Sequence, residues 1–350
     1  MRRLLLAALL LVLTTGGQAL AETVYFRGFI GEEPWQLELS IDGNAVRGRL
    51  THDHLPLLLE AGGSFDEQDN SIVARFGLAG GELSGTLLGE PNTAGTFEGT
   101  YLAFDTISPF RFEPVARYVD YSYSQGNIQA TSTYPLFTSL RLADLNVFVQ
   151  PDLMAEQIQF VESAQQADLE GLIRNEWWFD SRATVEYASP ALLSVLVTVS
   201  DYTGGAHPNR RYWSYNLSLL GTKHRPFHLA DLFRAGSDWF HRLERLVLED
   251  LADQQADWVR DGSVSELARS DLEVFLLTPA GLQFILPPYV VGPWVAGTFT
   301  VTVPLSDLID LLDPDGPVRH LRDPDQDLFG HSNGSDLSRH AQRSARLPGN

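Results

Sequence analysis

One loop of the sequence combines residue types that are common in binding sites. Between positions 202 and 209 the chain carries Tyr202, Gly204, Gly205, His207 and Asn209. Adjacent glycines permit positive φ angles, so the loop could present backbone amides, an aromatic ring and an imidazole to a sugar or to a protein cleft. The alternative is a tight turn in which His207 makes a buried hydrogen bond. We predict that the loop binds a ligand or organises the surface beside it.

A second loop, from Pro287 to Trp294, also has the composition of a binding surface. Pro287 restricts the backbone, while Tyr289 and Trp294 offer large ring faces of the kind that dominate binding energy at interfaces. Such a loop could stack on a pyranose ring or insert into the cleft of an enzyme. A core-packing crossover between two strands would have the same composition, and this alternative stays open.

Signals for metal binding and catalysis are weaker. His52 and His54 lie two residues apart without a third ligand, and the aspartates of 313–327 lack the glycine and glutamate of a calcium loop. The sequence has no Gly-x-Ser-x-Gly and no His-Glu-x-x-His motif. Asp201 and His207 are the best acid–base pair. We therefore predict no metal, no cofactor and no catalytic residue, with a cell-wall glycan hydrolase or deacetylase as the alternative.

The first 21 residues have the pattern of a secretory signal peptide. A basic start precedes the apolar run Leu4–Leu13, and Ala19–Ala21 has the small residues of a cleavage site. The run is too short to cross a bilayer, and no later segment has 18 uninterrupted apolar residues. We expect an exported protein, periplasmic or extracellular, with no membrane span after the signal is removed.

Charge and cysteine content exclude several classes of function. The chain has 45 acidic and 25 basic residues, and loss of Arg2 and Arg3 with the signal would change the net charge from −20 to −22. Such a surface repels nucleic-acid phosphates and favours encounter with a cationic partner. The absence of cysteine rules out disulfides, thiolate metal sites and cysteine nucleophiles. A hydrophobic content of 44% is that of a folded protein.

Residues 22–115 are predicted to be all β, an antiparallel meander or a small barrel. Apolar residues alternate with polar ones from Trp35 to Ile41, and Asp42-Gly43-Asn44 then supplies a turn. Glycines punctuate the region, and no helical stripe of useful length occurs. The other predicted strands cover Val46–Leu50, Ile72–Phe76, Leu83–Leu87, Thr96–Tyr101 and Phe110–Phe112.

Residues 116–312 mix helical and strand patterns, which predicts an α+β domain. Its sheet is expected to be mixed or antiparallel and packed on helices. A helical pattern follows Leu140, and Phe240, Leu243, Val247 and Leu251 form the stripe of a helix over 237–260. Strands are predicted at 177–188, 190–200, 211–219, 272–277, 282–286 and 298–303, with a short closing helix over 305–312. The polar, acidic segment 313–350 is predicted to be a disordered tail.

Five ordered segments of this second region resemble the RsiV/PdaC-like extracytoplasmic domain family over residues 118–312. They are Asp201–Asn209, Leu229–Phe233, Leu277–Phe284, Pro287–Gly297 and Val301–Leu308. The resemblance implies an α+β domain that serves as the lysozyme receptor of anti-sigma factors and as a non-catalytic segment ahead of peptidoglycan deacetylase domains. It does not extend to residues 22–115.

These observations predict a secreted, non-catalytic protein of the cell envelope. Its expected partner is a basic lysozyme-like protein or peptidoglycan, bound by the two loops. A hydrolase or deacetylase of cell-wall glycan and a structural envelope protein are the alternatives.

Overall fold

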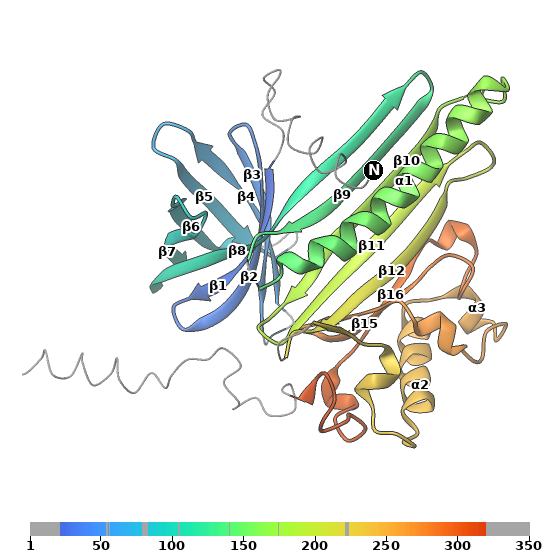
Figure 1. Ribbon diagram of the computed structural model, residues 1–350. Coiled ribbons are helices and arrows are strands. Elements are labelled where there is room, and N and C mark those ends of the chain that lie inside the picture. The colour runs from blue at the N-terminus through green and yellow to red at the C-terminus, as the bar shows by residue number, and fades with distance from the viewer. Residues whose placement is uncertain are drawn as a thin grey trace, which may run out of the picture. The chain divides into compact units, whose positions relative to one another are not determined.

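A computed structural model describes residues 22–319 except 54, 56, 79–82, 104–105, 140, 174 and 221–223 (Figure 1). The chain forms two compact units, with divisions between His52 and Asp53, between Pro56 and Leu57, and between Tyr118 and Val119. The predicted signal peptide lies outside the described residues, as does most of the predicted tail. No helix in the described ranges is long and apolar enough to span a membrane.

The first unit is a closed antiparallel barrel. Each strand pairs with the next, and β1 also pairs with β8, with Val24 opposite Arg117 at one end and Ile30 opposite Phe110 at the other. The barrel form of the prediction is therefore confirmed. The strands are β1 (Glu22–Ile30), β2 (Glu33–Asp42), β3 (Ala45–His52), β4 (Leu58–Asp66), β5 (Ser71–Gly77), β6 (Leu83–Pro91), β7 (Phe97–Ala103) and β8 (Thr106–Gln125).

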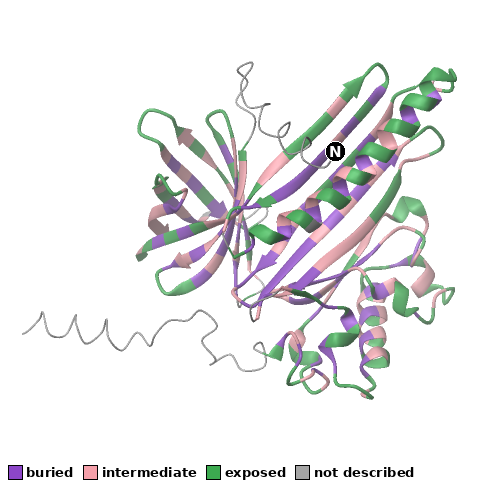
Figure 2. Ribbon diagram, viewed as in Figure 1, coloured by how far each residue is buried: buried purple, intermediate pink, exposed green. Residues whose placement is uncertain are grey.

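Side chains from alternate strand positions fill the barrel. Buried and exposed residues alternate along its strands (Figure 2), as expected when one face of a sheet meets a core. Phe76, Phe97 and Phe112 are fully buried, and the rings of Phe97 and Phe110 lie 4.8 Å apart between centroids. The interior is thus packed with side chains, chiefly aromatic and branched aliphatic ones.

Strand β4, which the sequence did not predict, contains two adjacent glycines with different surroundings. A Cβ built on Gly63 would lie 1.8 Å from the carbonyl oxygen of Val73 in β5. A Cβ built on Gly62 would meet no atom within 4 Å. Gly63 therefore permits the close approach of β4 and β5, and Gly62 has no such role.

The second unit contains a mixed sheet, as predicted. It comprises the end of β8 followed by β9 (Ile128–Phe137), β10 (Trp177–Ala188), β11 (Leu192–Tyr202), β12 (Asn209–Ser218) and β13 (Arg225–Pro226). The β9–β10 pair is parallel, whereas β10–β11, β11–β12 and β12–β13 are antiparallel. A parallel pair needs a long crossover, and α1 (Asn146–Leu169) provides it while packing on β9 and β10 (Figure 1).

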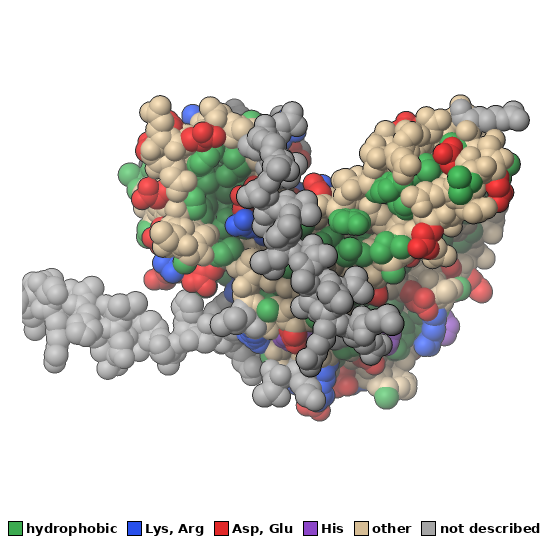
Figure 3. Space-filling model, turned by 45° about the horizontal axis from the view of Figure 1, so that its top comes forward, with side chains coloured by type: hydrophobic (Ala, Val, Ile, Leu, Met, Phe, Trp, Pro, Cys, Tyr) green, Lys and Arg blue, Asp and Glu red, His purple; other side chains and the backbone are tan. Residues whose placement is uncertain are grey.

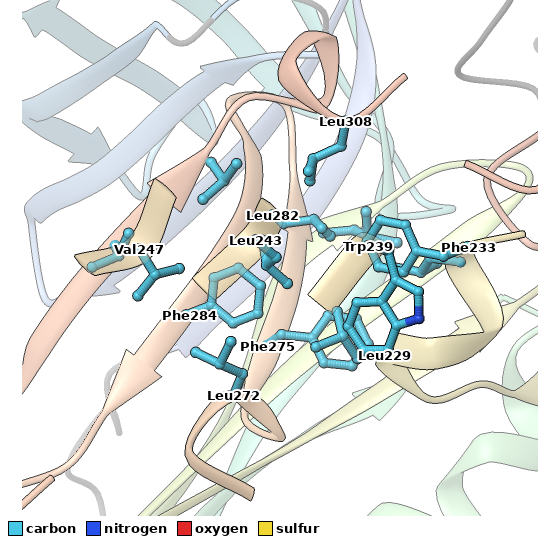
Figure 4. Close-up of a cluster of buried hydrophobic side chains, with 14 of the residues drawn as sticks. Leu229, Phe233, Trp239, Leu243, Val247, Leu272, Phe275, Leu282, Phe284 and Leu308 are labelled. Carbon is cyan, nitrogen blue, oxygen red and sulfur yellow. The ribbon is translucent and has the colours of Figure 1, made fainter. Parts of the chain in front are cut away.

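A three-stranded antiparallel sheet and a helix form the remaining core of this unit. The sheet comprises β14 (Phe275–Thr278), β15 (Gly281–Leu286) and β16 (Phe299–Val303), and β16 contacts α2 (Trp239–Asp253). Figure 4 shows Leu243 and Val247 of α2 beside Phe284 in this cluster. Strands predominate in both units, so the predicted α+β class applies only loosely.

Two predicted helices are shorter than expected. The segment predicted as one helix over 237–260 is divided into α2 and α3 (Asp257–Arg260), because Gln255 between them adopts a φ of 66°. The predicted closing helix over 305–312 contains only the short turn Leu305–Asp307. The other named 3₁₀ turns of the described residues are Ala143–Leu145, Leu229–Leu232, Arg269–Leu272 and Trp294–Ala296.

Packing continues beyond the predicted start of the tail at residue 313. The N–H of Asp313 donates to the carbonyl of Leu232 at 2.9 Å, and Val318 is fully buried in the core of the second unit. The ordered domain therefore includes residues 313–319. The buried side chain of Val318 anchors the start of a segment whose overall polarity had suggested a tail.

A buried polar junction connects β11 and β12 to β14. The Ser194 hydroxyl donates to Asn216 Oδ1 at 2.6 Å and accepts from the N–H of Leu277 at 3.1 Å. The Asn216 amide donates to the carbonyl of Phe275 at 2.8 Å. The side chains of Ser194 and Asn216 thereby satisfy backbone groups of β14 that would otherwise be buried without partners.

The start of α2 contains an acid–histidine pair with a testable consequence. Asp238 precedes the helix, and its carboxylate bonds to His241 Nδ1. This hydrogen bond, followed by the charge of Asp238, raises the pKa of His241 above its ordinary value. The pair therefore stabilises the fold below the ordinary histidine pKa of about 6.5, and this stabilisation disappears as the pH rises through the raised value.

We expect Asp238→Asn to lower the pKa of His241 towards its ordinary value. The substitution should also destabilise the protein more at pH 5 than at pH 9. An NMR titration of the imidazole resonances measures the first effect, and urea unfolding at the two pH values measures the second. The other histidines provide the internal control, and an unchanged His241 titration would contradict the pairing.

Candidate functional site

The loop between β11 and β12 is shaped by its own residues. Gly204 and Gly205 have φ angles of 91° and 120°, which favour glycine. The hydroxyl of Tyr202 donates to the carbonyl of Gly205 at 3.0 Å, and its ring stacks on Trp178 with a centroid distance of 6.4 Å. Tyr202 and the two glycines thus define the turn that presents His207.

Asn209 belongs to a polar group at the base of the same loop. Its amide donates to Asp201 Oδ2 at 3.0 Å, and Asp201 is only 8% exposed. The guanidinium of Arg211 bridges Asp201 at 3.1 Å and Glu156 of α1 at 2.9 Å. The carboxylate of Asp201 is therefore engaged by an amide and an arginine, whereas His207 has other partners. This arrangement does not support the acid–base pair weighed from the sequence.

The loop between β15 and β16 makes a tight turn at its prolines. Tyr289 has a φ of 74°, and its N–H donates to the carbonyl of Gly292 at 2.9 Å. The carbonyl of Pro287 accepts from the N–H of Val290 at 3.3 Å. Trp294 begins the next 3₁₀ turn. Pro287 therefore fixes the entry to the turn, while Tyr289 and Trp294 are carried to the surface.

The two loops meet at three rings, His207, Tyr289 and Trp294, which we call the aromatic cluster. The His207 and Trp294 rings stack with a centroid distance of 4.4 Å and an interplanar angle of 19°. His207 Nε2 lies 3.2 Å from the hydroxyl of Tyr289, and Nδ1 lies 2.9 Å from the carbonyl of Pro208. Because a carbonyl can only accept, Nδ1 carries a proton and donates it to Pro208, while Nε2 faces the hydroxyl of Tyr289.

A shallow, open cavity of about 290 Å³ lies beside the aromatic cluster. Tyr289 is 57% exposed and Trp294 is 37% exposed, so both rings retain accessible surface. The cavity is lined by His207, Pro208, Asn209, Arg210, Arg211, Pro288, Tyr289 and Trp294. The structure therefore brings together His207, Asn209, Tyr289 and Trp294 of the predicted residues, while Tyr202, Gly204, Gly205 and Pro287 shape the loops around them.

The charge at the cavity differs in sign from the charge of the whole chain. Arg210 and Arg211 line it, and among the described residues Arg210 has no ion-pair partner. Acidic side chains elsewhere are scattered over the face shown in Figure 3. Sequence reasoning missed both arginines, although two consecutive arginines at the end of a candidate loop in an acidic protein were a usable signal.

The other predicted sites gain no support from the geometry. His52 lies edge-on to Trp35 with centroids 4.7 Å apart, and its Nε2 is 3.3 Å from Glu33, while His54 lies outside the described residues. Within the described ranges, no three His, Cys, Asp or Glu side chains are grouped closely enough to hold a metal ion.

The mixed sheet, its crossover helix and the two loops define a β-rich domain that carries the aromatic cluster at its surface. Residues 122–210 match the family model "Deacetylase PdaC", and residues 230–306 match "Protein of unknown function (DUF3298)". These matches support a PdaC/DUF3298-like domain over residues 122–210 and 230–306, and they bear out the resemblance. The first match contains the 202–209 loop, and the second contains the 287–294 loop.

Two solved structures are similar to this chain. One is a DUF3298 family protein from Pseudomonas aeruginosa, with 14% identity, a TM-score of 0.44, and coverage of 57% of this chain and 93% of that chain. The other is a DUF3298 family member from Bacteroides fragilis, with 15% identity, a TM-score of 0.41, and coverage of 58% and 94%. A search of curated proteins found no match.

Proposed function

We propose that this protein is an exported, non-catalytic binding protein of the bacterial cell envelope, and that the aromatic cluster holds a sugar ring of cell-wall glycan. The observation that carries the proposal is the meeting of His207, Tyr289 and Trp294, with two of the rings still accessible, beside an open cavity. Aromatic residues held in place before binding lose little entropy when a ligand stacks on them.

The shape and chemistry of the cavity favour a polymer over an enclosed small molecule. Deep pockets bury most of a small ligand, whereas a shallow cavity of about 290 Å³ can cover one face of a ring. Arg210 adds a cation next to the rings, which suits a glycan that carries carboxylates. The contact between His207 and Tyr289 holds the imidazole in a fixed orientation.

A basic lysozyme-like protein is the second candidate ligand, and the overall charge of −20 favours it. Electrostatic attraction would speed association at low salt and would weaken as salt screens the charges. Arg210 and Arg211 would repel a basic partner at the cavity itself. The acidic side chains elsewhere on the surface would therefore attract the lysozyme-like protein. An association rate that is independent of salt would count against this candidate.

The name of the family model that matches residues 122–210 supports a deacetylase as the enzymatic alternative. In that case the protein would release acetate from peptidoglycan, and the release would fall in a His207→Ala variant. A structural envelope protein would bind neither lysozyme nor glycan.

The decisive experiment is the double substitution Tyr289→Ala with Trp294→Ala. We expect at least a tenfold loss of affinity for purified peptidoglycan in a sedimentation assay, equivalent to about 1.4 kcal/mol. Tyr121→Ala is the matched control, because Tyr121 is also an exposed aromatic residue of the second unit and is 45% exposed.

Parallel measurements separate the alternatives. Binding to immobilised lysozyme at low and moderate salt tests the protein partner, and acetate release from peptidoglycan tests the enzyme. Peptidoglycan binding that is equal in the double variant and the wild type would refute the role of the aromatic cluster. Loss of binding in the Tyr121→Ala control as well would indicate a general effect on folding.

A further inference from the structure

Strand β12 has an edge that is paired over only part of its length. One side of β12 pairs with β11 at every position from Asn209 to Ser218. The other side pairs with β13 only at Leu217 and Ser218. Within the described part of the chain, the stretch from Arg210 to Tyr215 therefore has a partner strand on one side alone. Figure 1 shows β12 as the last long strand of this sheet.

The register identifies which backbone groups face outwards. The N–H of Phe227 donates to the carbonyl of Asn216 at 3.0 Å on the side away from β11. In an antiparallel strand the N–H and C=O of one residue point the same way, and direction alternates along the chain. Arg210, Tyr212 and Ser214 must then also direct their backbone groups outwards, and no described residue bonds to them.

These three residues present a regular ladder of donors and acceptors. Alternate residues are spaced by about 6.8 Å along a strand, so the ladder from Arg210 to Ser214 spans about 14 Å. An extended peptide has the same repeat and can pair with such an edge as an additional strand. The repeat of the ladder therefore matches that of an extended polypeptide.

A second cavity in this unit, of about 470 Å³, adjoins the same edge. Trp213, Trp239 and Phe275 line it with aromatic rings, and Tyr212 and Ser214 of the ladder also line it. Its other lining residues are His228, Leu229, Ala230, Arg269, Glu273 and Val274. A cavity beside an exposed edge can receive one side chain of an added strand.

One cation lies in the ladder and another lines the cavity beside it. Arg210 lies in the ladder, and the guanidinium of Arg269 lies 5.0 Å from the ring centroid of Trp239 and 5.1 Å from that of Phe240. This stacking holds the Arg269 guanidinium in position at the mouth of the cavity. Glu273 is the one carboxylate in the cavity lining, and Arg211 is already paired with acids. The local charge favours an acidic peptide.

We propose that the free edge of β12 binds an extended acidic peptide of a partner protein as an added strand, with one apolar side chain in the Trp213–Trp239 cavity. Its carboxylates lie near Arg210 and Arg269, and its backbone pairs with Arg210, Tyr212 and Ser214. This surface shares Arg210 with the cavity beside the aromatic cluster but includes none of its three rings, so the inference does not depend on glycan binding.

Amide hydrogen exchange followed by NMR tests the proposal directly. The probe is a short synthetic peptide in which aspartate and leucine alternate, and the control is the same peptide with every backbone nitrogen methylated. At saturation the amides of Arg210, Tyr212 and Ser214 should exchange at least tenfold more slowly. Those of Arg211 and Trp213 already bond to β11 and should change little. The methylated peptide should give no protection.

Two variants separate this site from the aromatic cluster. Arg269→Ala should weaken binding of the probe several-fold, while the Tyr289→Ala, Trp294→Ala double variant should bind it as the wild type does. Failure of the probe to protect the three amides would overturn the proposal, as would equal binding of the methylated peptide.

The protein without peptide shows whether another occupant covers the edge. Protection of the three amides that disappears after removal of residues 320–350 would assign the edge to the chain's own end. Protection that rises with protein concentration would assign it to a second copy. Either result would overturn a partner peptide as the occupant.

Discussion

Substitution of Gly63 by alanine is expected to lower the free energy of unfolding of the barrel by about 3 kcal/mol. The added methyl group would lie 1.8 Å from the carbonyl oxygen of Val73, so β4 and β5 would have to separate locally. Their ladder pairs Gly63 with Ala74 in the middle of both strands, where separation disrupts hydrogen bonds on either side. Urea unfolding measures the loss, and hydrogen exchange in β4 and β5 locates it.

Gly62→Ala is the matched control because it adds the same methyl group to the adjacent position. No atom lies within 4 Å of that methyl group. Its effect should stay within about 0.5 kcal/mol, and the reduced freedom of the unfolded chain could make it slightly stabilising. An equal decrease in the free energy of unfolding in the two variants would contradict a role of Gly63 in the close approach of β4 and β5. It would indicate instead that glycine is needed there for backbone flexibility.

Replacement of Asn216 by leucine should lower the free energy of unfolding of the second unit by about 3 kcal/mol. The change deprives the carbonyl of Phe275 and the hydroxyl of Ser194 of their partners inside the core. A buried polar group without a partner costs about 1–3 kcal/mol, and here two groups are affected. Thermal and urea unfolding measure the change.

Ser214→Ala provides the comparison on the same face of β12. It removes only a 3.3 Å bond from the Asn216 amide to a half-buried hydroxyl, so the expected loss is below about 1 kcal/mol. If Asn216→Leu were as well tolerated as Ser214→Ala, the junction between β11, β12 and β14 would not contribute to stability.

Strands and helices were predicted correctly where the apolar residues follow a regular local pattern. Strict alternation from Trp35 to Ile41 predicted a strand that the structure extends to Glu33–Asp42. Strand β4 was not predicted because Gly62 and Gly63 interrupt its alternating pattern. It forms a strand because it pairs with β3 on one side and β5 on the other. The apolar stripe of α2 was visible, but the left-handed conformation of Gln255 that ends it had no sequence signal.

The sequence did not predict contacts within the candidate site between residues that are far apart in the chain. Each loop was identified from its own composition, yet nothing in either loop indicated that His207 stacks on Trp294. That contact depends on the arrangement of β11, β12, β15 and β16, which brings two segments more than eighty residues apart to one surface. The unpaired edge of β12 could not be predicted from the sequence either, because it depends on which strands pair in the whole sheet.

The closure of the barrel by β1 and β8 has a consequence for the order of folding. The barrel closes only when β1 pairs with β8, for example at Val24 and Arg117. This pairing joins residues far apart in sequence, so we expect it to form last. During synthesis β1 appears first and keeps one open edge until β8 has been made. We therefore expect a folding intermediate in which the sheet is open and β1 is an unpaired edge strand. Nascent chains would begin to associate at this edge.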